Sequence, residues 1–291
     1  PGMSEPEVTR FAPSPTGHLH LGHAYAALLA HQAARKTGGR FLVRMENLDQ
    51  ARCDAGFEAA ILEDLAWLGL AWDGPVRRQS DCVHAFRAAL DALSASGVVY
   101  PCFCTRGDIA REIEAMARAP QGPDGPLYPG TCRMLSSAER RNRLAGGEPH
   151  ALRLDVGAAL AHLGFPALHV EETGRGPCGE TGRIAVEPAL LGDIVLGRKD
   201  TGVGYHLAVV VDDADQGITL VTRGDDLFAA THVQRLLQAL LGLSTPRYGH
   251  HALIRDAQGR RLAKRDRDQT LAALRTAGVT PKDIRRRLGV G

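Results

Sequence analysis

Two histidines lie three positions apart near the N-terminus, at a point where a predicted strand runs into a predicted helix. His20 and His23 flank Gly22 and follow the turn Pro13–Gly17, so a glycine-bearing loop leads into the first turn of the helix. That first turn carries unpaired N–H groups and a partial positive charge, which together bind phosphate. Gly22 also leaves room for a nucleotide to lie against the backbone. The pattern indicates a nucleotide site, although such a tetrapeptide alone is common on protein surfaces.

A second group of basic residues lies near the other end of the chain, in Arg261-Leu-Ala-Lys-Arg265. Residues 255–291 carry eleven Lys and Arg against four Asp, a net charge of +7, whereas the remainder has a net charge of −5. This asymmetry favours contact between the C-terminal end and a polyanion, and the alternative is a solvated basic tail. Lys264 is the candidate for contact with phosphate.

Three cysteines have the spacing of metal ligands. Cys102 and Cys104 are one residue apart in a proline-containing turn, and Cys132 follows after 28 positions. A tight pair of thiolates closed by a distant third is typical of a zinc site, and buried thiols are the alternative. Tyr128, His150 and Cys178 are the candidates for a fourth ligand.

The elements that position these residues alternate between strands and helices. We expect strands at 9–12 and 41–45 and helices at 20–36, 55–68 and 83–94, a pattern that favours a parallel α/β sheet. Further strands are expected at 205–213 and 218–222, followed by a helix at 227–241. The expected units are a catalytic domain in two halves (3–99 and 188–245), an insertion with its own small core (100–187) and a helical tail (246–291).

Composition excludes several classes of protein. The 291 residues are 44% hydrophobic and 23% charged, as in ordinary globular proteins, and no apolar run approaches the roughly 20 residues of a membrane span. No signal peptide is recognisable, so the six cysteines are expected to be thiols or metal ligands in a reducing, cytoplasmic compartment.

The histidine motif near the N-terminus and the basic motif around Lys264 together resemble the two motifs of class I aminoacyl-tRNA synthetases, specifically those of the glutamyl branch. Arg10-Phe-Ala-Pro-Ser-Pro-Thr-Gly and the following His20-Leu-Gly-His23 fit closely over about fourteen residues. The second motif is looser: the family's Lys-Met-Ser-Lys-Ser loop keeps its second lysine as Lys264 but has Ala263 in place of the serine. The resemblance implies a Rossmann-type doubly wound parallel sheet with a zinc-bearing insertion and a short helical C-terminal subdomain.

This resemblance also implies a reaction, in which a glutamate carboxylate attacks the α-phosphorus of ATP and releases pyrophosphate. His20, Gly22, His23 and Lys264 would bind ATP, and Mg²⁺ would accompany the nucleotide. The implied glutamate site has cations for the carboxylates and an anion for the ammonium; its residues are Arg10, Ser14, Glu46, Tyr205 and Arg223. Which arginine binds which carboxylate stays open, and a structural salt bridge is the alternative role for Glu46 and Arg223.

The insertion indicates a fourth zinc ligand, and the C-terminal end limits the choice of RNA partner. Similarity to Tyr-Pro-Gly-Thr-Cys in the family's zinc-bearing insertion favours Tyr128 as the fourth ligand beside Cys102, Cys104 and Cys132. Only 26 residues follow Arg265, too few for an anticodon-reading domain. We therefore expect a member of the glutamyl branch that transfers glutamate to queuosine in the anticodon of tRNA(Asp).

Three other functions remain open at this point. A truncated synthetase that charges tRNA(Glu) would share every residue of the glutamate site. A zinc-stabilised RNA-binding module with a degenerate nucleotide fold would not need His20, His23 and Lys264. A small-molecule adenylyltransferase would use the same histidine motif, but the glutamate-site residues and the basic tail argue against that function.

Overall fold

The computed structural model describes residues 5–116, 118–200, 202–254 and 270–290. Its strands are β1 (Val8–Phe11), β2 (Arg40–Met45), β3 (Arg77–Arg78), β4 (Val99–Cys102), β5 (Gln121–Gly122), β6 (Gly125–Pro126), β7 (Ala151–Leu154), β8 (His169–Glu172), β9 (Gly182–Ala185), β10 (Val195–Gly197), β11 (Leu220–Gly224) and β12 (Arg247–His251). Its α-helices are α1 (Leu21–Lys36), α2 (Ala55–Trp67), α3 (Val83–Ala95), α4 (Arg106–Ala115), α5 (Ser137–Ala145), α6 (Val156–His162), α7 (Tyr205–Asp215), α8 (Phe228–Leu240), α9 (Leu271–Thr276) and α10 (Pro281–Leu288). Short 3₁₀ turns are η1 (Gln79–Cys82), η2 (Thr131–Met134), η3 (Pro188–Leu191) and η4 (Asp225–Leu227).

The centre of the molecule is a parallel sheet with the spatial order β3-β2-β1-β11-β12. β1 pairs with β2, β2 with β3 and β11 with β12, all in parallel. The Thr219 amide donates to the Val8 carbonyl at 3.0 Å, which places the start of β11 beside β1. Nearly all residues of β1 and β2 are buried, as expected for parallel strands covered on both faces. The predicted doubly wound α/β fold is confirmed.

The N-terminal elements follow local sequence signals. α1 begins after His20, whose side chain accepts a hydrogen bond from the Gly22 amide, and ends before Gly38 and Gly39. Asp54 caps α2 in the same way. The predicted strands at 9–12 and 41–45 and the helices at 20–36, 55–68 and 83–94 are confirmed within one or two residues.

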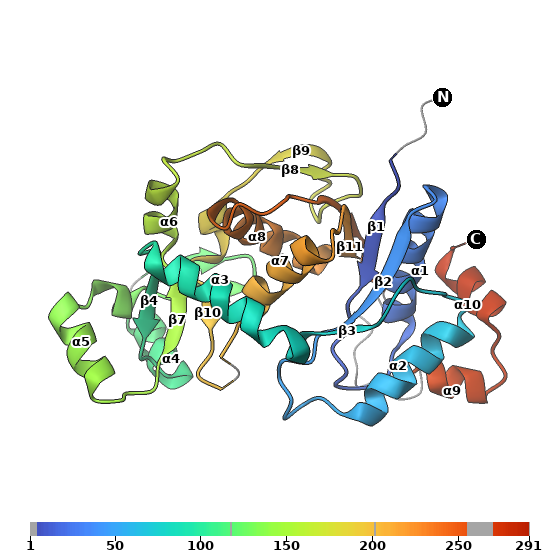
Figure 1. The fold of residues 1–291 in the computed structure, drawn as a ribbon, viewed down its shortest axis with the longest axis horizontal. Helices are drawn as coiled ribbons and strands as arrows, with labels where there is room; N and C mark the ends of the chain where they lie inside the picture. The colour runs from blue at the N-terminus through green and yellow to red at the C-terminus, as the bar shows by residue number, and fades with distance from the viewer. Residues whose placement is uncertain (1–4, 117, 201, 255–269, 291) are drawn as a thin grey trace.

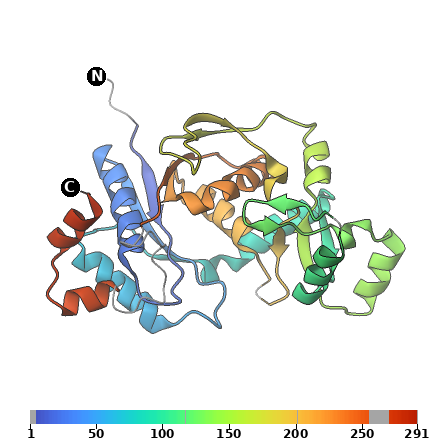
Figure 2. The same cartoon turned by 180° about the vertical axis from the view of Figure 1, so that it is seen from behind.

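The insertion lies at one end of the molecule, far from the C-terminal helices (Figures 1 and 2). Its sheet has the order β10-β7-β4 and is antiparallel. Buried Tyr100, Cys102, Phe103 and Cys132 form the expected small core. α9 and α10 pack at the opposite end against α2 and α1 (Figure 2).

Several expected elements and boundaries were wrong. Residues 205–213 were expected to form a strand but belong to helix α7. The prediction failed because a short, continuous apolar run is compatible with a buried helix as well as with a buried strand. The region 246–291 begins with strand β12, so it is not wholly helical, and the strand expected at 218–222 is β11, two residues further along.

The boundaries of the insertion also differ from expectation, because strands cross between the units. β8, inside the expected range 100–187, joins the central sheet through the pairing of Glu172 with Tyr248. β10, inside the expected range 188–245, pairs with β7 of the insertion. Such pairings connect distant parts of the chain, so the residue pattern within one short segment does not predict them.

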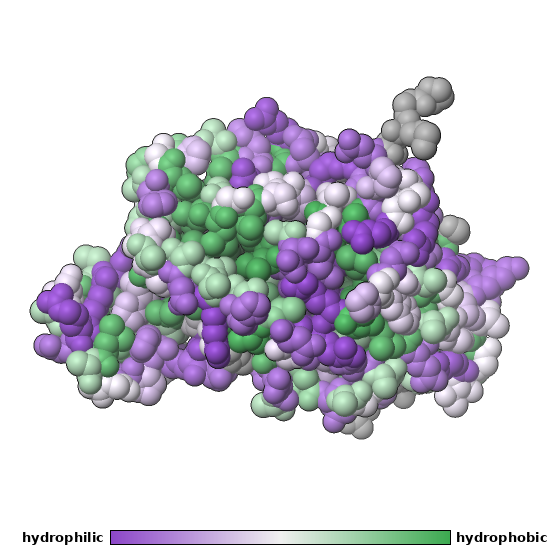
Figure 3. Space-filling model, in the orientation of Figure 1, coloured by the Kyte–Doolittle hydropathy of each residue, from purple (hydrophilic) through white to green (hydrophobic). Residues whose placement is uncertain are grey.

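Hydrophilic and hydrophobic residues gather over different elements on the face shown in Figure 3. Hydrophilic side chains gather where α7 approaches β3 (Figure 3). Between these two elements, Arg77 Nε lies 2.7 Å from Asp212 Oδ1, and Arg77 Nη1 lies 2.6 Å from Asp215 Oδ2. Apolar atoms gather between α6 and α8 (Figure 3). In the described ranges, no helix is both long and apolar enough to span a membrane.

Candidate active site

A cavity of about 400 Å³ opens at the carboxyl ends of β1 and β11. In a doubly wound sheet the strand order reverses between two central strands, and ligands bind in the crevice at that point. The cavity gathers eight of the predicted site residues; these are Arg10, Ser14, His20, Gly22, His23, Glu46, Tyr205 and Arg223. They come from four separate parts of the chain, and only the fold brings them together.

The two histidine rings lie against each other at the start of α1, with their planes tilted by 34°. Their ring centroids are 3.8 Å apart, His20 Nδ1 accepts from the Gly22 amide at 3.1 Å, and His23 Nδ1 accepts from the His20 amide at 3.2 Å. Because each Nδ1 is an acceptor, each neutral ring carries its proton on Nε2. A Cβ atom at Gly22 would lie 3.0 Å from the His20 ring, so glycine leaves room for this arrangement. An imidazole Nε2–H is a donor of the kind that phosphate oxygens accept.

Lys264 lies outside the described residues, as do Arg261, Ala263 and Arg265. The chain on both sides of that segment reaches the site. Ile254 lines the cavity, and Thr270 forms an isolated antiparallel bridge with His20. The Leu271 amide also donates to the Leu19 carbonyl at 2.8 Å.

A network of charged side chains underlies one wall of the cavity. Arg10 Nε lies 2.9 Å from Asp213 Oδ1, and Arg44 Nη1 lies 2.8 Å from the same oxygen. Arg44 is fully buried and also lies 3.5 Å from Glu46 Oε1. Burial opposes ionisation of Asp213, but the two arginines outweigh it and hold the pKa of that carboxyl below its usual value.

Glu46 faces the cavity after the end of β2. Its burial raises the pKa of the carboxyl, an effect that Arg44 and Arg10 partly offset. A buried carboxylate of this kind accepts hydrogen bonds strongly from an ammonium group, because few waters compete for it. The salt bridge expected as the alternative role is also present, since Arg44 contacts Glu46.

Arg223 is held differently from Arg10. Its Nε donates to His250 Nε2 at 3.1 Å, Nη1 donates to Gln234 Oε1 at 2.9 Å, and Nη2 donates to Thr231 Oγ1 at 2.7 Å. All three acceptors are uncharged groups, and no carboxylate of the described residues lies within 4.0 Å of this guanidinium. The charge of Arg223 is therefore available to an anion in the cavity.

Tyr205 begins α7 and lines the same cavity, where it is 37% exposed; its partial desolvation in the cavity wall and the nearby Glu46 raise the pKa of its phenol. The hydroxyl therefore stays protonated at neutral pH and can donate a hydrogen bond. The next residue, His206, lines an adjoining cavity, and burial lowers its pKa to about 4. Both side chains are thus uncharged at neutral pH.

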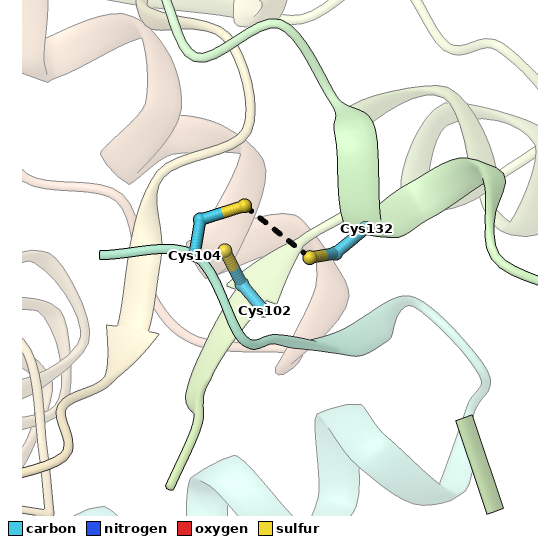
Figure 4. A group of neighbouring side chains, drawn as sticks. All are labelled: Cys102, Cys104 and Cys132. Carbon is cyan, nitrogen blue, oxygen red and sulfur yellow. Dashed lines mark hydrogen bonds between the residues drawn. The ribbon is translucent and has the colours of Figure 1, made fainter. Parts of the chain in front are cut away.

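The three predicted cysteines converge in the insertion. Their sulfur atoms lie within 4.8 Å of one another, with Cys102 at the end of β4, Cys104 two residues beyond it and Cys132 in η2 (Figure 4). Cys104 Sγ and Cys132 Sγ are 3.5 Å apart. Two sulfurs that share a tetrahedral Zn²⁺ stand about 3.8 Å apart, given Zn–S bonds of about 2.3 Å. The cluster therefore fits zinc.

Of the candidates for a fourth ligand, Tyr128 lies nearest to the cluster. Its Oη is 3.4 Å from Cys102 Sγ and 3.6 Å from Cys104 Sγ, close to the roughly 3.5 Å expected between oxygen and sulfur ligands of one zinc. His150 is not part of the cluster, and its Nδ1 contacts the Glu148 carbonyl. Cys178 is exposed and lines a separate cavity with Asp225.

The residues that hold Arg10 and Arg223 were not predicted from the sequence. Asp213 was assigned to a strand, although two consecutive acids at the end of an apolar run were a signal of buried charge. His250 and Glu172 carried no signal, because they are 78 residues apart and meet only where β8 pairs with β12.

Comparison with known proteins agrees with this fold. Residues 7–289 match the family described as the catalytic domain of class I tRNA synthetases (E and Q). Glutamyl-Q tRNA(Asp) synthetase of Rhodobacter capsulatus is 50% identical over 97% of this chain and 100% of its own length. The protein of that description from Nocardia farcinica is 46% identical over 94% of this chain and 81% of its own length.

A solved structure shows the same architecture. Glutamate-tRNA synthetase from Elizabethkingia anophelis is 28% identical, with a TM-score of 0.75 over 91% of this chain, and the match covers 54% of that larger chain. The fold and site define a class I tRNA synthetase catalytic domain. This chain belongs to the E and Q family of those enzymes, and its curated relatives in R. capsulatus and N. farcinica are glutamyl-Q tRNA(Asp) synthetases.

Proposed function

We propose that this protein activates L-glutamate with ATP and transfers the glutamyl group to queuosine in the anticodon of tRNA(Asp). The observation that carries the first step is the shared cavity of the histidine motif, Glu46 and two arginines. The acceptor follows from the relatives, which are named for the same reaction and match along almost the whole chain.

In the first step, an oxygen of the glutamate α-carboxylate attacks the α-phosphorus of ATP, and the bond to the bridging oxygen of pyrophosphate breaks. His20 and His23 donate Nε2–H to phosphate oxygens, and Lys264 neutralises the leaving pyrophosphate. Mg²⁺ bound to the nucleotide supplies further charge neutralisation.

The glutamate-binding residues orient the substrate for that attack. Glu46 accepts from the ammonium group, Arg10 and Arg223 bind the carboxylates, and Ser14 and Tyr205 supply hydrogen bonds. Glutamine lacks the second carboxylate, so it leaves one arginine without an anionic partner.

In the second step, a hydroxyl of the queuosine cyclopentene ring attacks the adenylate carbonyl, forming an ester and releasing AMP. An anticodon base suits such a site because a single-stranded loop can place a base into a pocket. The basic residues of 255–291 contact RNA phosphates, so binding weakens as salt rises.

Cys102, Cys104, Cys132 and Tyr128 hold Zn²⁺ in this proposal. The ligands belong to the insertion core and none lines the cavity of the histidines, so the metal stabilises the insertion.

The test is glutamate transfer from ATP and labelled glutamate to three RNAs. We expect label on tRNA(Asp) that contains queuosine and none on the same tRNA with guanosine at that position. Label on tRNA(Glu) would favour a truncated glutamyl-tRNA synthetase. ATP–pyrophosphate exchange without RNA should depend on glutamate and be much weaker with glutamine, and equal exchange would contradict the two-arginine site.

A further inference from the structure

One residue outside the cavity wall, His250, connects Arg223 to the buried carboxylate of Glu172. His250, on β12, receives the Arg223 Nε–H on its Nε2 at 3.1 Å, and its Nδ1 lies 2.6 Å from Glu172 Oε2 on β8. Glu172 and His250 are each 3% exposed, and Arg223 is 6% exposed. The three side chains form a continuous chain of hydrogen bonds from the cavity to the next pair of strands.

The chemistry of the donors fixes the position of the proton on His250. An arginine Nε–H can only donate, so His250 Nε2 must be the acceptor and Nδ1 must carry the proton. That Nδ1–H then donates to Glu172. A His250 ring with its proton on Nε2 would face the arginine with two opposed N–H groups.

Backbone contacts fix the orientation of Glu172 in turn. Its Oε1 accepts from the amides of Gly174 and His250 at 2.8 and 2.9 Å, which leaves Oε2 to face the imidazole. The carboxylate is ionised, because hydrogen bonds from His250 hold the pKa of Glu172 down despite its burial. The His250 ring therefore lies between the negative charge of Glu172 and the guanidinium of Arg223.

Three of the five N–H groups of Arg223 are used by His250, Gln234 and Thr231, one on each nitrogen. Each terminal nitrogen therefore keeps one further N–H, the number that a carboxylate accepts in a bidentate pair. Arg10 contrasts with this, since Asp213 already takes two of its nitrogens.

We propose that Glu172 and His250 are positioning residues for glutamate binding: Glu172 fixes the His250 tautomer, and His250 orients Arg223 toward a substrate carboxylate without neutralising it. This inference rests on the proposed role of Arg223 in binding glutamate. It assigns a function in substrate selection to β8, a strand that contributes no residue to the cavity wall.

We call the hydrogen-bonded chain Glu172–His250–Arg223 the relay. The variant Glu172→Gln tests it. The two backbone amides keep the Gln oxygen on their side, so its NH₂ group faces His250 Nδ1 and shifts the ring proton to Nε2. Nε2–H then opposes Arg223. In glutamate-dependent ATP–pyrophosphate exchange, we expect KM for glutamate to rise about tenfold or more, because the substrate loses roughly one hydrogen bond to a charged group. KM for ATP should not change.

Glu171→Gln is the matched control, because Glu171 is the exposed neighbour on the same strand. It should leave both KM values and the thermal midpoint unchanged. ¹⁵N NMR of histidine-labelled protein should show the Nδ1–H tautomer of His250 in the wild type and the Nε2–H tautomer in Glu172→Gln, with His250→Gln used for assignment.

The second pair of variants acts at His250 and serves if Glu172→Gln does not fold. His250→Gln keeps an acceptor for the Arg223 Nε–H, whereas His250→Leu removes it, so KM for glutamate should rise far more in the leucine variant. Equal KM values in these two variants, or an unchanged tautomer and KM in Glu172→Gln, would overturn the relay. A parallel rise in both KM values with a lower thermal midpoint would show a purely structural role.

Arg223→Lys separates this inference from the proposed function. If the wild type shows no glutamate-dependent exchange, the proposed function fails together with the relay. If Arg223→Lys raises KM for glutamate while Glu172→Gln and His250→Leu do not, only the relay fails.

Discussion

Arg10 and Asp213, which are 203 residues apart in the sequence, form a buried two-point ion pair beneath the substrate cavity. Arg10 Nε and Nη2 lie 2.9 and 3.4 Å from the two carboxylate oxygens, and one of those oxygens also binds Arg44. This carboxylate joins β1, β2 and α7. It also offsets much of the positive charge of Arg10, whereas the acceptors that Arg223 contacts among the described residues are uncharged.

We predict that Asp213→Asn destabilises the fold and weakens glutamate binding together. The change leaves Arg10 and Arg44 without their shared anion in a buried site, and removing one partner of a buried ion pair costs about 3–5 kcal/mol. Denaturant unfolding should show that loss, and exchange kinetics should show a higher KM for glutamate. Asp215→Asn, at a more exposed position on the same helix, is the control and should cost less than about 1 kcal/mol.

Tyr128→Phe should lower zinc occupancy. It removes the oxygen nearest to the three sulfurs, so the variant should lose metal to a chelator that the wild type resists. His150→Ala should keep about one equivalent of zinc. Metal analysis that finds zinc retained in Tyr128→Phe and lost in His150→Ala would show that His150 is the fourth ligand.

Lys264→Ala should slow pyrophosphate exchange by about 100-fold with little change in KM for glutamate, because the lysine charge counts mainly in the transition state. Lys282→Ala, an exposed lysine of α10, is the control for loss of one positive charge. Exchange at the wild-type rate in Lys264→Ala would remove this lysine from the mechanism.

Asp64, in α2, should make stability depend on pH. It is 1% exposed, and burial raises its pKa to about 6 despite the nearby Arg275. A carboxyl whose pKa is higher in the folded state than in the unfolded chain binds more protons when folded, so stability falls as pH rises between about 4 and 6.

The free energy of unfolding of the wild type, relative to Asp64→Asn, should therefore fall by up to ~3 kcal/mol between pH 4 and pH 7. Denaturant unfolding at a series of pH values measures this difference. A difference that stays constant, or that rises with pH, would contradict the raised pKa.

Features that depend on neighbouring residues could be predicted from the sequence alone. His20 and Gly22 specify the start of α1, Asp54 specifies the start of α2, and the cysteine spacing specifies a cluster whose sulfur atoms do converge. Caps, turns and short-range ligand pairs are local, so residue type and spacing are enough to predict them.

Features that depend on distant partners could not be predicted in this way, because they form only when the chain has folded. Residues 205–213 form a helix because α7 packs among α3, α8 and the charged groups of β1 and β2, where its buried Asp212 and Asp213 meet arginines. Glu172 reaches His250 only because β8 adds to the central sheet beside β12. Burial and strand pairing between distant segments set these contacts, and neither property is encoded in local periodicity.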